Sequence, residues 1–76
     1  MNNEELKQAL LNLVREYKEN DDFDAQGELE TILANADNRW TAGYIQCAFE
    51  EADDVVDGIE MLETVDQWDA TFWDIT

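Results

Sequence analysis

Apolar side chains recur at helical spacing along the first nineteen residues of the chain. One apolar face is formed by residues three or four positions apart: Leu6, Leu10, Leu13, Val14 and Tyr17. Asn3 can cap the start of this helix, and Glu4 and Glu5 then place negative charge at the positive end of the helix dipole. The pattern therefore predicts an amphipathic helix that begins at Asn3 and runs to about Glu19.

Two further segments repeat this periodicity over shorter lengths. Asp24 can cap a second helix, although Gly27 in its first turn weakens the signal for where that helix begins. The apolar residues of the second helix are Leu29, Ile32, Leu33 and Ala36. We expect a third helix to start near Asp37 or Thr41 and to run to the mid-fifties. Its apolar positions are Trp40, Tyr44, Ile45, Ala48, Phe49, Ala52 and Val56.

Asp57 and Gly58 form a turn signal that interrupts this pattern. Asp57, with Glu60 three residues later, fits an acidic version of a capping box, which predicts a fourth helix from about Gly58 to Trp68. The apolar residues of this helix are Ile59, Leu62 and Val65. The alternative is one bent helix that continues through Gly58.

Aromatic residues gather at the C-terminal end of the chain. Trp68, Phe72 and Trp73 belong either to the core or to an interface with a partner, including a second copy in a homodimer. We expect residues 70–76 to pack on the helices or on a second subunit. The sequence thus predicts an all-α fold: one domain over residues 1–76, built as a small bundle of three to four short helices with an aromatic C-terminal tail packed on it.

The composition supports a folded helical chain. Of the 76 residues, 45% are hydrophobic, none is proline and three are glycine. This apolar content argues against intrinsic disorder, and the scarcity of proline and glycine leaves little to interrupt a helix. A chain of this length lies close to the lower limit for a self-sufficient hydrophobic core.

Twenty acidic and four basic residues give the chain a formal net charge of −16. Self-repulsion on this scale opposes the compact state and makes stability depend on salt. The charge could serve solubility or life in a very salty cytoplasm, but we favour a surface directed at a cationic partner. Nucleic acid and anionic membranes would both be repelled, so we expect neither as a direct partner.

The acidic residues are densest in residues 50–69, which contain nine carboxylates and no basic residue. Seven of the nine fall three positions apart, so on a helix they would form a row that winds around the axis. Such a row is comparable with the charge density of a duplex backbone, and a groove that binds phosphates could accept it in place of nucleic acid. The candidate partner-binding residues are Glu50, Glu51, Asp54, Asp57, Glu60, Glu63, Asp66 and Asp69.

Residues 22–30 resemble the first nine positions of an EF-hand calcium loop. Oxygen-bearing residues stand at the first, third, fifth and ninth positions, and Gly27 stands at the sixth. The twelfth position requires a bidentate Glu, but here it is Leu33. We therefore expect no metal site.

Length, charge and helix content are also similar to those of acyl carrier proteins. That family attaches phosphopantetheine to a Ser in an Asp-Ser-Leu motif, whereas this chain contains no Ser, so we expect no cofactor. The chain also has no His, and its one cysteine, Cys47, lies in an apolar run where we expect it to be buried. These absences predict that the protein has no catalytic residues and is not an enzyme.

These observations predict a small inhibitor that presents a nucleic-acid-like anionic surface to the basic groove of a nucleic-acid-binding protein or nuclease. In general character it resembles phage-encoded anti-restriction and anti-CRISPR proteins that mimic DNA. Two alternatives stay open: an immunity or antitoxin protein that neutralises a cationic toxin, and an acidic calcium-binding or scaffold domain. No signal peptide or membrane-length apolar run is visible, so we expect a cytoplasmic location, in the host cell if the protein is phage-encoded.

Overall fold

The structure is a computed structural model that describes residues 1–20, 22–69 and 73. Its regular elements are α1 (Asn3–Glu19), α2 (Ala25–Ala34), α3 (Arg39–Glu51), α4 (Val55–Leu62) and the short 3-10 helix η1 (Val65–Gln67). The described residues include no strand, which confirms the predicted all-α fold with four short helices.

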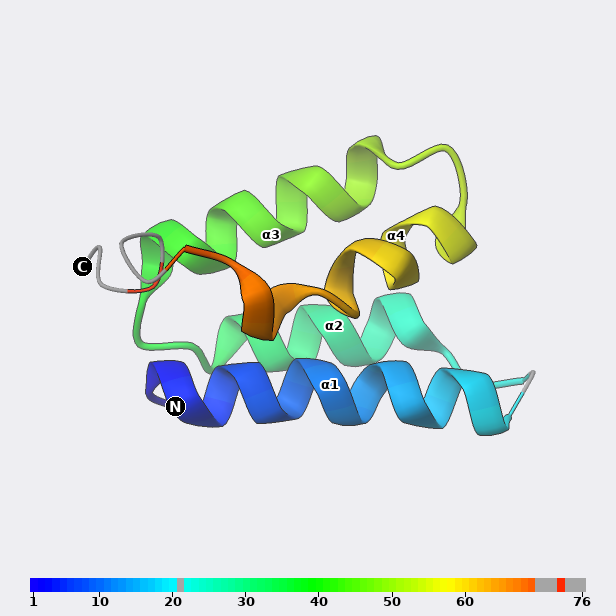
Figure 1. Cartoon of the computed structure of the whole chain (residues 1–76), viewed down its shortest axis with the longest axis horizontal. Coiled ribbons are helices and arrows are strands. Elements are labelled where there is room, and N and C mark those ends of the chain that lie inside the picture. The colour runs from blue at the N-terminus through cyan, green and yellow to red at the C-terminus, as the bar shows by residue number, and fades with distance from the viewer. Residues whose placement is uncertain (21, 70–72, 74–76) are drawn as a thin grey trace.

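Each α-helix runs back against the direction of the one before it (Figure 1). The main contacts join α1 to α2 and α4, and join α3 to the same two helices. This up-and-down order places the loop between α1 and α2 at the same end of the bundle as the loop between α3 and α4, while the N-terminus lies at the other end (Figure 1).

The hydrophobic core lies between the four helices and η1. Its fully buried apolar side chains are Leu6 and Leu10 of α1, Ile45 of α3, Leu62 of α4 and Val65 of η1. Leu29 and Leu33 contribute the buried side of α2. The predicted apolar face of α1 is confirmed, since Leu13 and Val14 are also buried and Tyr17 packs against the same core.

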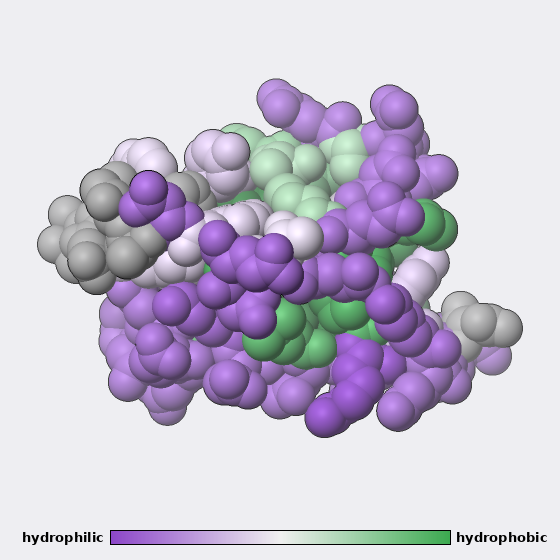
Figure 2. Space-filling view, in the orientation of Figure 1, coloured by the Kyte–Doolittle hydropathy of each residue, from purple (hydrophilic) through white to green (hydrophobic). Residues whose placement is uncertain are grey.

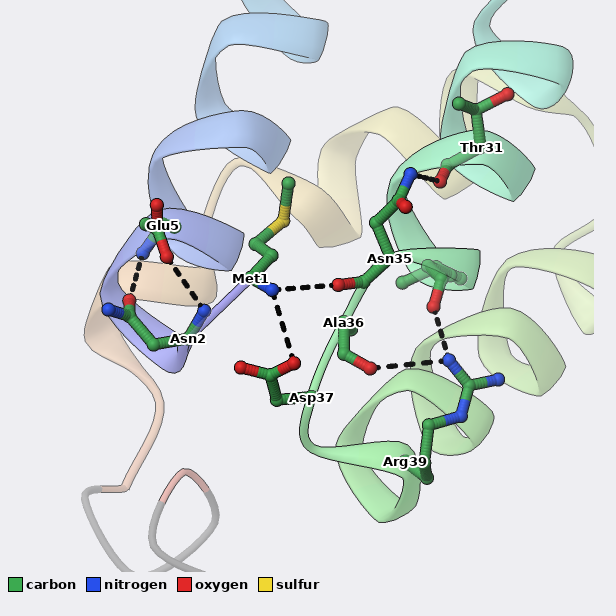
Figure 3. A network of polar contacts seen from close by, with 9 residues as sticks. Met1, Asn2, Glu5, Thr31, Asn35, Ala36, Asp37 and Arg39 are labelled. Carbon is green, nitrogen blue, oxygen red and sulfur yellow. Dashed lines mark hydrogen bonds and ion pairs between the residues drawn. The ribbon is translucent and has the colours of Figure 1, made fainter.

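The N-terminal cap of α1 is Asn2, and the prediction of Asn3 was wrong by one residue. The Asn2 side chain accepts a hydrogen bond from the Glu5 backbone N–H at 2.8 Å, and the Glu5 carboxylate accepts one from the Asn2 N–H at 2.9 Å (Figure 3). This reciprocal capping box satisfies two donors that the first turn leaves without helical partners. Asp24 caps α2 as predicted, because its carboxylate accepts from the Gly27 N–H at 3.1 Å.

Arg39 connects the start of α3 to the end of α2. Its guanidinium donates to the Leu33 carbonyl oxygen at 2.6 Å and to the Ala36 carbonyl oxygen at 3.4 Å (Figure 3). A positive side chain beside the last carbonyls of a helix satisfies their free lone pairs and suits the negative end of the dipole. The side chain of Asn38 caps α3 by accepting from the Thr41 N–H at 3.0 Å.

The break between the third and fourth helices lies earlier than the sequence predicted. α3 ends at Glu51, so it does not reach the mid-fifties, and α4 begins at Val55. The cap of α4 is Asp54, whose carboxylate accepts from the Asp57 N–H at 2.9 Å, so both the predicted Asp57 cap and the single bent helix were wrong. α4 ends at Leu62, and η1 covers part of the stretch once assigned to the fourth helix.

Gly58 does not form the predicted turn. It lies inside α4, at a point where this helix packs closely against α3. It is buried, and an added Cβ would stand 2.6 Å from the ring of Phe49 on α3. The glycine therefore lets the two helices approach each other at a point where a side chain would meet a rigid aromatic ring.

Trp73 confirms that the aromatic C-terminal end packs on the helices. Its side chain is 3% exposed, and its indole N–H donates to the Val65 carbonyl oxygen at 3.2 Å. The Asn38 amide donates to the Trp73 carbonyl oxygen, also at 3.2 Å. Trp68 is half-buried against the same core, and Phe72 lies outside the described residues.

Three residues assigned to the apolar face of the third helix are exposed instead. Trp40, Tyr44 and Val56 keep 49%, 52% and 50% of their surface accessible. Cys47, expected in the core, is exposed as well. The physical reason is the helical step of about 100° per residue, which turns Tyr44 and Cys47 away from the side that Ile45 directs inward.

Candidate interaction surface

The acidic segment, residues 50–69, wraps from the end of α3 over the α3–α4 loop, α4 and η1. Seven of the eight candidate residues are exposed, and Glu63 is half-buried. In chain order, Glu50 and Glu51 end α3, Asp54 caps the start of α4, Asp57 and Glu60 lie on α4, Glu63 is its C-terminal cap, Asp66 lies in η1 and Asp69 follows η1. The acids therefore stand on several short elements and do not form one straight helical row.

Asp54 and Asp57 have a structural role. Asp54 accepts the backbone hydrogen bond that starts α4, and Asp57 lies in the first turn of that helix. Negative charge at the N-terminal end of a helix is favoured by the partial positive charge there. These two carboxylates thus help to fold the chain as well as contributing to its surface charge.

Glu50 and Glu51 occupy a position that folding alone does not favour. They form the C-terminal end of α3, whose last turn contains no basic residue. The C-terminal end of a helix carries partial negative charge, so two further negative charges there are repelled. The Glu50 carboxylate accepts from the Gln46 amide at 3.4 Å, which is a contact with an uncharged group.

An open hollow of about 220 Å³ lies beside the α3–α4 loop. It is lined by Gln26, Phe49, Glu50, Ala52, Asp54 and Val55. Gln26 belongs to α2, so this hollow shows that the start of α2 lies next to the loop that connects the third and fourth helices.

The fold brings a second group of acids to the same end of the bundle. Glu19, Asp22, Asp24 and Glu28 are exposed near the α1–α2 loop, which shares that end with the α3–α4 loop (Figure 1). The sequence alone does not group these residues with the acidic segment, because they are distant from it along the chain. The signal that could have found them is the up-and-down order of four helices, which places alternate loops together.

Basic side chains compensate little of this charge. Among the described residues, the ion pair between Lys18 and Glu63 is the one that joins the acidic segment to a basic side chain. Lys7 pairs with Glu4 at 3.5 Å, and its ammonium lies 4.9 Å from the ring centre of Trp73. Arg15 donates to the Asn12 amide oxygen at 3.1 Å.

Four aromatic side chains form a connected row, and one of them, Trp68, belongs to the acidic segment. Trp40 stacks on Tyr44 with ring centres 6.0 Å apart, and Tyr44 meets Trp68 edge-on at 6.4 Å. Trp68 in turn stacks on Trp73 at 5.9 Å. This aromatic row, Trp40, Tyr44, Trp68 and Trp73, runs from the exposed side of α3 into the core. Figure 2 shows pale and green surface over α3, bordered by the purple of hydrophilic residues.

The segment that resembles a calcium loop is helical from Ala25 onward. Asp24 is occupied as the cap of α2, and the residues after it, from Ala25 to Ala34, form that helix. In the described part of the chain, no three side chains of His, Cys, Asp or Glu lie close enough together to hold a metal ion. Within the same residues, no helix has both the length and the apolar character needed to cross a membrane.

Comparison with known proteins adds no relative. The chain matches no protein-family model, no curated protein and no solved structure. Inferences about function therefore depend on the surface described above.

Proposed function

We propose that this protein is a small acidic inhibitor that acts in the cytoplasm, where it occupies the basic groove of a nucleic-acid-binding protein or nuclease. The observation that supports the proposal is the exposure of the carboxylates in residues 50–69, of which Glu63 is paired with a lysine. A groove lined by Lys and Arg to hold phosphates would find a similar density of negative charge on this surface.

The mechanism would be competitive. The net charge of −16 speeds the encounter with a positively charged groove, and this acceleration falls as salt screens the charges. Exposed aromatic side chains on α3 such as Trp40 and Tyr44, the second of which lines a hollow with Asp69, would then slow dissociation by burying apolar area against the partner.

Glu50 and Glu51 are the acids that we expect to contact the partner most directly. Asp54 and Asp57 are accounted for by the start of α4, and Glu63 by its ion pair. Glu50 and Glu51 oppose the dipole of α3. An exposed residue that works against folding is expected to serve another purpose, and we infer that Glu50 and Glu51 serve binding.

Capture of partners from a bacterial lysate tests the proposal. The full chain is immobilised, the lysate is passed over it at low salt, and bound proteins are eluted first with duplex DNA and then with high salt. We expect duplex DNA to release a basic nuclease, helicase or other nucleic-acid-handling protein, because both ligands would compete for one groove.

A matched pair of double variants provides the control. E50Q/E51Q and E4Q/E5Q each remove two neighbouring carboxylates, the first at the acidic end of the bundle and the second at the opposite end (Figure 1). Capture should fall for E50Q/E51Q and persist for E4Q/E5Q. Recovery of no basic nucleic-acid-binding protein, or equal loss in both variants, would contradict the proposal. A captured toxin encoded beside this gene would assign the immunity role.

A further inference from the structure

An open hollow of about 380 Å³ lies where α3, α4 and the chain after η1 meet. Its lining residues are Tyr44, Met61, Trp68 and Asp69. Among the described residues, this wall offers two aromatic rings, a thioether and one carboxylate. Tyr44 is 52% exposed, so its ring is accessible from solvent.

The outer face of α3 extends this hollow. Trp40, stacked on Tyr44, is 49% exposed. At about 100° per residue, Trp40, Tyr44 and Glu51 fall within an arc of roughly 40° on α3. The exposed pair of Trp40 and Tyr44 therefore has one carboxylate, Asp69, in the adjoining hollow and another, Glu51, farther along the same face of α3.

We propose that this hollow takes an arginine side chain of the basic partner. Aromatic faces attract a cation through the negative potential above the ring, and Asp69 supplies a carboxylate in the same wall. The proposal rests on the proposed function and names the anchor within that interface: stacking of a guanidinium on Tyr44 with charge-assisted hydrogen bonding to Asp69.

The chemistry of the hollow distinguishes this occupant from others. A second copy of the chain would bring a further charge of −16 to a surface that already carries the same charge, so self-association is opposed. A wholly apolar segment would desolvate the Asp69 carboxylate, which costs free energy. Arginine is favoured over lysine because its planar guanidinium stacks on rings and binds carboxylates through a fork of donors.

The test compares hexa-arginine amide with hexa-lysine amide as probes of equal charge. Each is titrated into the full chain by isothermal calorimetry at fixed ionic strength. The informative quantity is the ratio of the two affinities, because the general attraction of either peptide to the acids largely cancels in it. Wild type should prefer hexa-arginine, and removal of the Tyr44 ring should lower that preference by about two- to fivefold.

Three variants make the result specific. Tyr44→Leu removes the ring but keeps apolar bulk, Tyr44→Phe keeps the ring, and Glu16→Gln removes an exposed charge from α1, outside the acidic segment. We expect the arginine preference to fall in Tyr44→Leu and to persist in the other two. Trp40→Leu changes the stacked neighbour and serves as the second ring variant if circular dichroism shows that Tyr44→Leu does not fold.

The outcomes separate this inference from the proposed function. If both peptides bind and the arginine preference survives loss of the Tyr44 or Trp40 ring, the anchor is wrong while the acidic surface stands. If neither peptide binds the wild-type chain, the cation-binding surface itself is wrong and the anchor fails with it.

Discussion

Gly58 and Gly43 are both helical glycines, but their surroundings are opposite. A Cβ on Gly58 would stand 2.6 Å from the Phe49 ring, whereas a Cβ on Gly43 would meet nothing within 4 Å. At Gly43, alanine should raise the free energy of unfolding by about 0.5–1 kcal/mol, because it lowers the backbone entropy lost on folding.

At Gly58 we expect the opposite sign. The same helix-propensity gain is outweighed by overpacking against the buried ring, which leaves a net loss of up to about 2 kcal/mol for Gly58→Ala. Urea unfolding of the two variants, measured side by side, checks this difference. Stabilisation by both alanines would show that α3 and α4 do not meet closely at Gly58.

The side chain of Asn38 is an example of a role that no local pattern predicts. Its amide both caps α3 and donates to the Trp73 carbonyl oxygen, 35 positions away along the chain. A capping Asn is recognisable from sequence, and the predicted start of the third helix, near Asp37 or Thr41, lies within two residues of the observed start at Arg39. The contact with Trp73 depends on the path of the chain after η1, and hydrophobic periodicity does not predict that path.

At the scale of elements, Glu50 and Glu51 at the C-terminal end of α3 should lower the free energy of unfolding. E50Q/E51Q removes two negative charges from the negative end of a helix dipole, so it should raise the free energy of unfolding by about 0.5–2 kcal/mol. E4Q/E5Q removes two from the positive end of α1 and should lower it by a similar amount, about 0.5–2 kcal/mol.

Chemical denaturation of the two double variants gives the comparison. Gln at position 5 can still complete the capping box, so the difference in stability between the two variants reports mainly where the removed charges lie relative to the helix dipoles. Because both variants change the net charge equally, equal stabilisation of the two would mean that net charge alone matters and that the position of Glu50 and Glu51 carries no cost.

Helix content was predictable from the sequence because apolar spacing was clear in all four segments. The boundary between α3 and α4 was not, because Asp53, Asp54 and Asp57 all offer a capping carboxylate within five positions. Asp54 is the cap in the structure, and Gly58 then serves helix packing inside α4. Which of these neighbouring carboxylates caps the helix depends on tertiary contacts, such as the packing of Gly58 against Phe49. Local sequence propensity does not describe such contacts.

At the scale of the whole molecule, the fold assembles more acidic surface than the sequence indicated. Residues 50–69 were identified from their composition, but Glu19, Asp22 and Glu28 join them through the up-and-down order of the helices. The exposure of Trp40 and Tyr44 was also unforeseen, because the period of α3 allowed both to be assigned to the core.

The net charge of −16 predicts opposite effects of salt on folding and on binding. Added sodium chloride screens repulsion within the folded chain, so thermal unfolding should shift to higher temperature between about 0.01 and 0.5 M salt, as the Debye length falls from about 30 Å to a few ångströms. Differential scanning calorimetry checks this. A melting temperature that does not rise with salt would show that self-repulsion is not a major term in the stability.

The central claim is that the exposed carboxylates at the end of α3 occupy a groove made for nucleic acid. It is tested most directly by titrating the chain against labelled duplex DNA bound to the captured partner and following the displacement of DNA by fluorescence anisotropy. Wild type and E4Q/E5Q should displace the DNA at similar concentrations. E50Q/E51Q should require about two- to thirtyfold more, since each exposed ion pair contributes on the order of 0.2–1 kcal/mol. Binding of the chain to the partner without displacement of DNA would contradict the account.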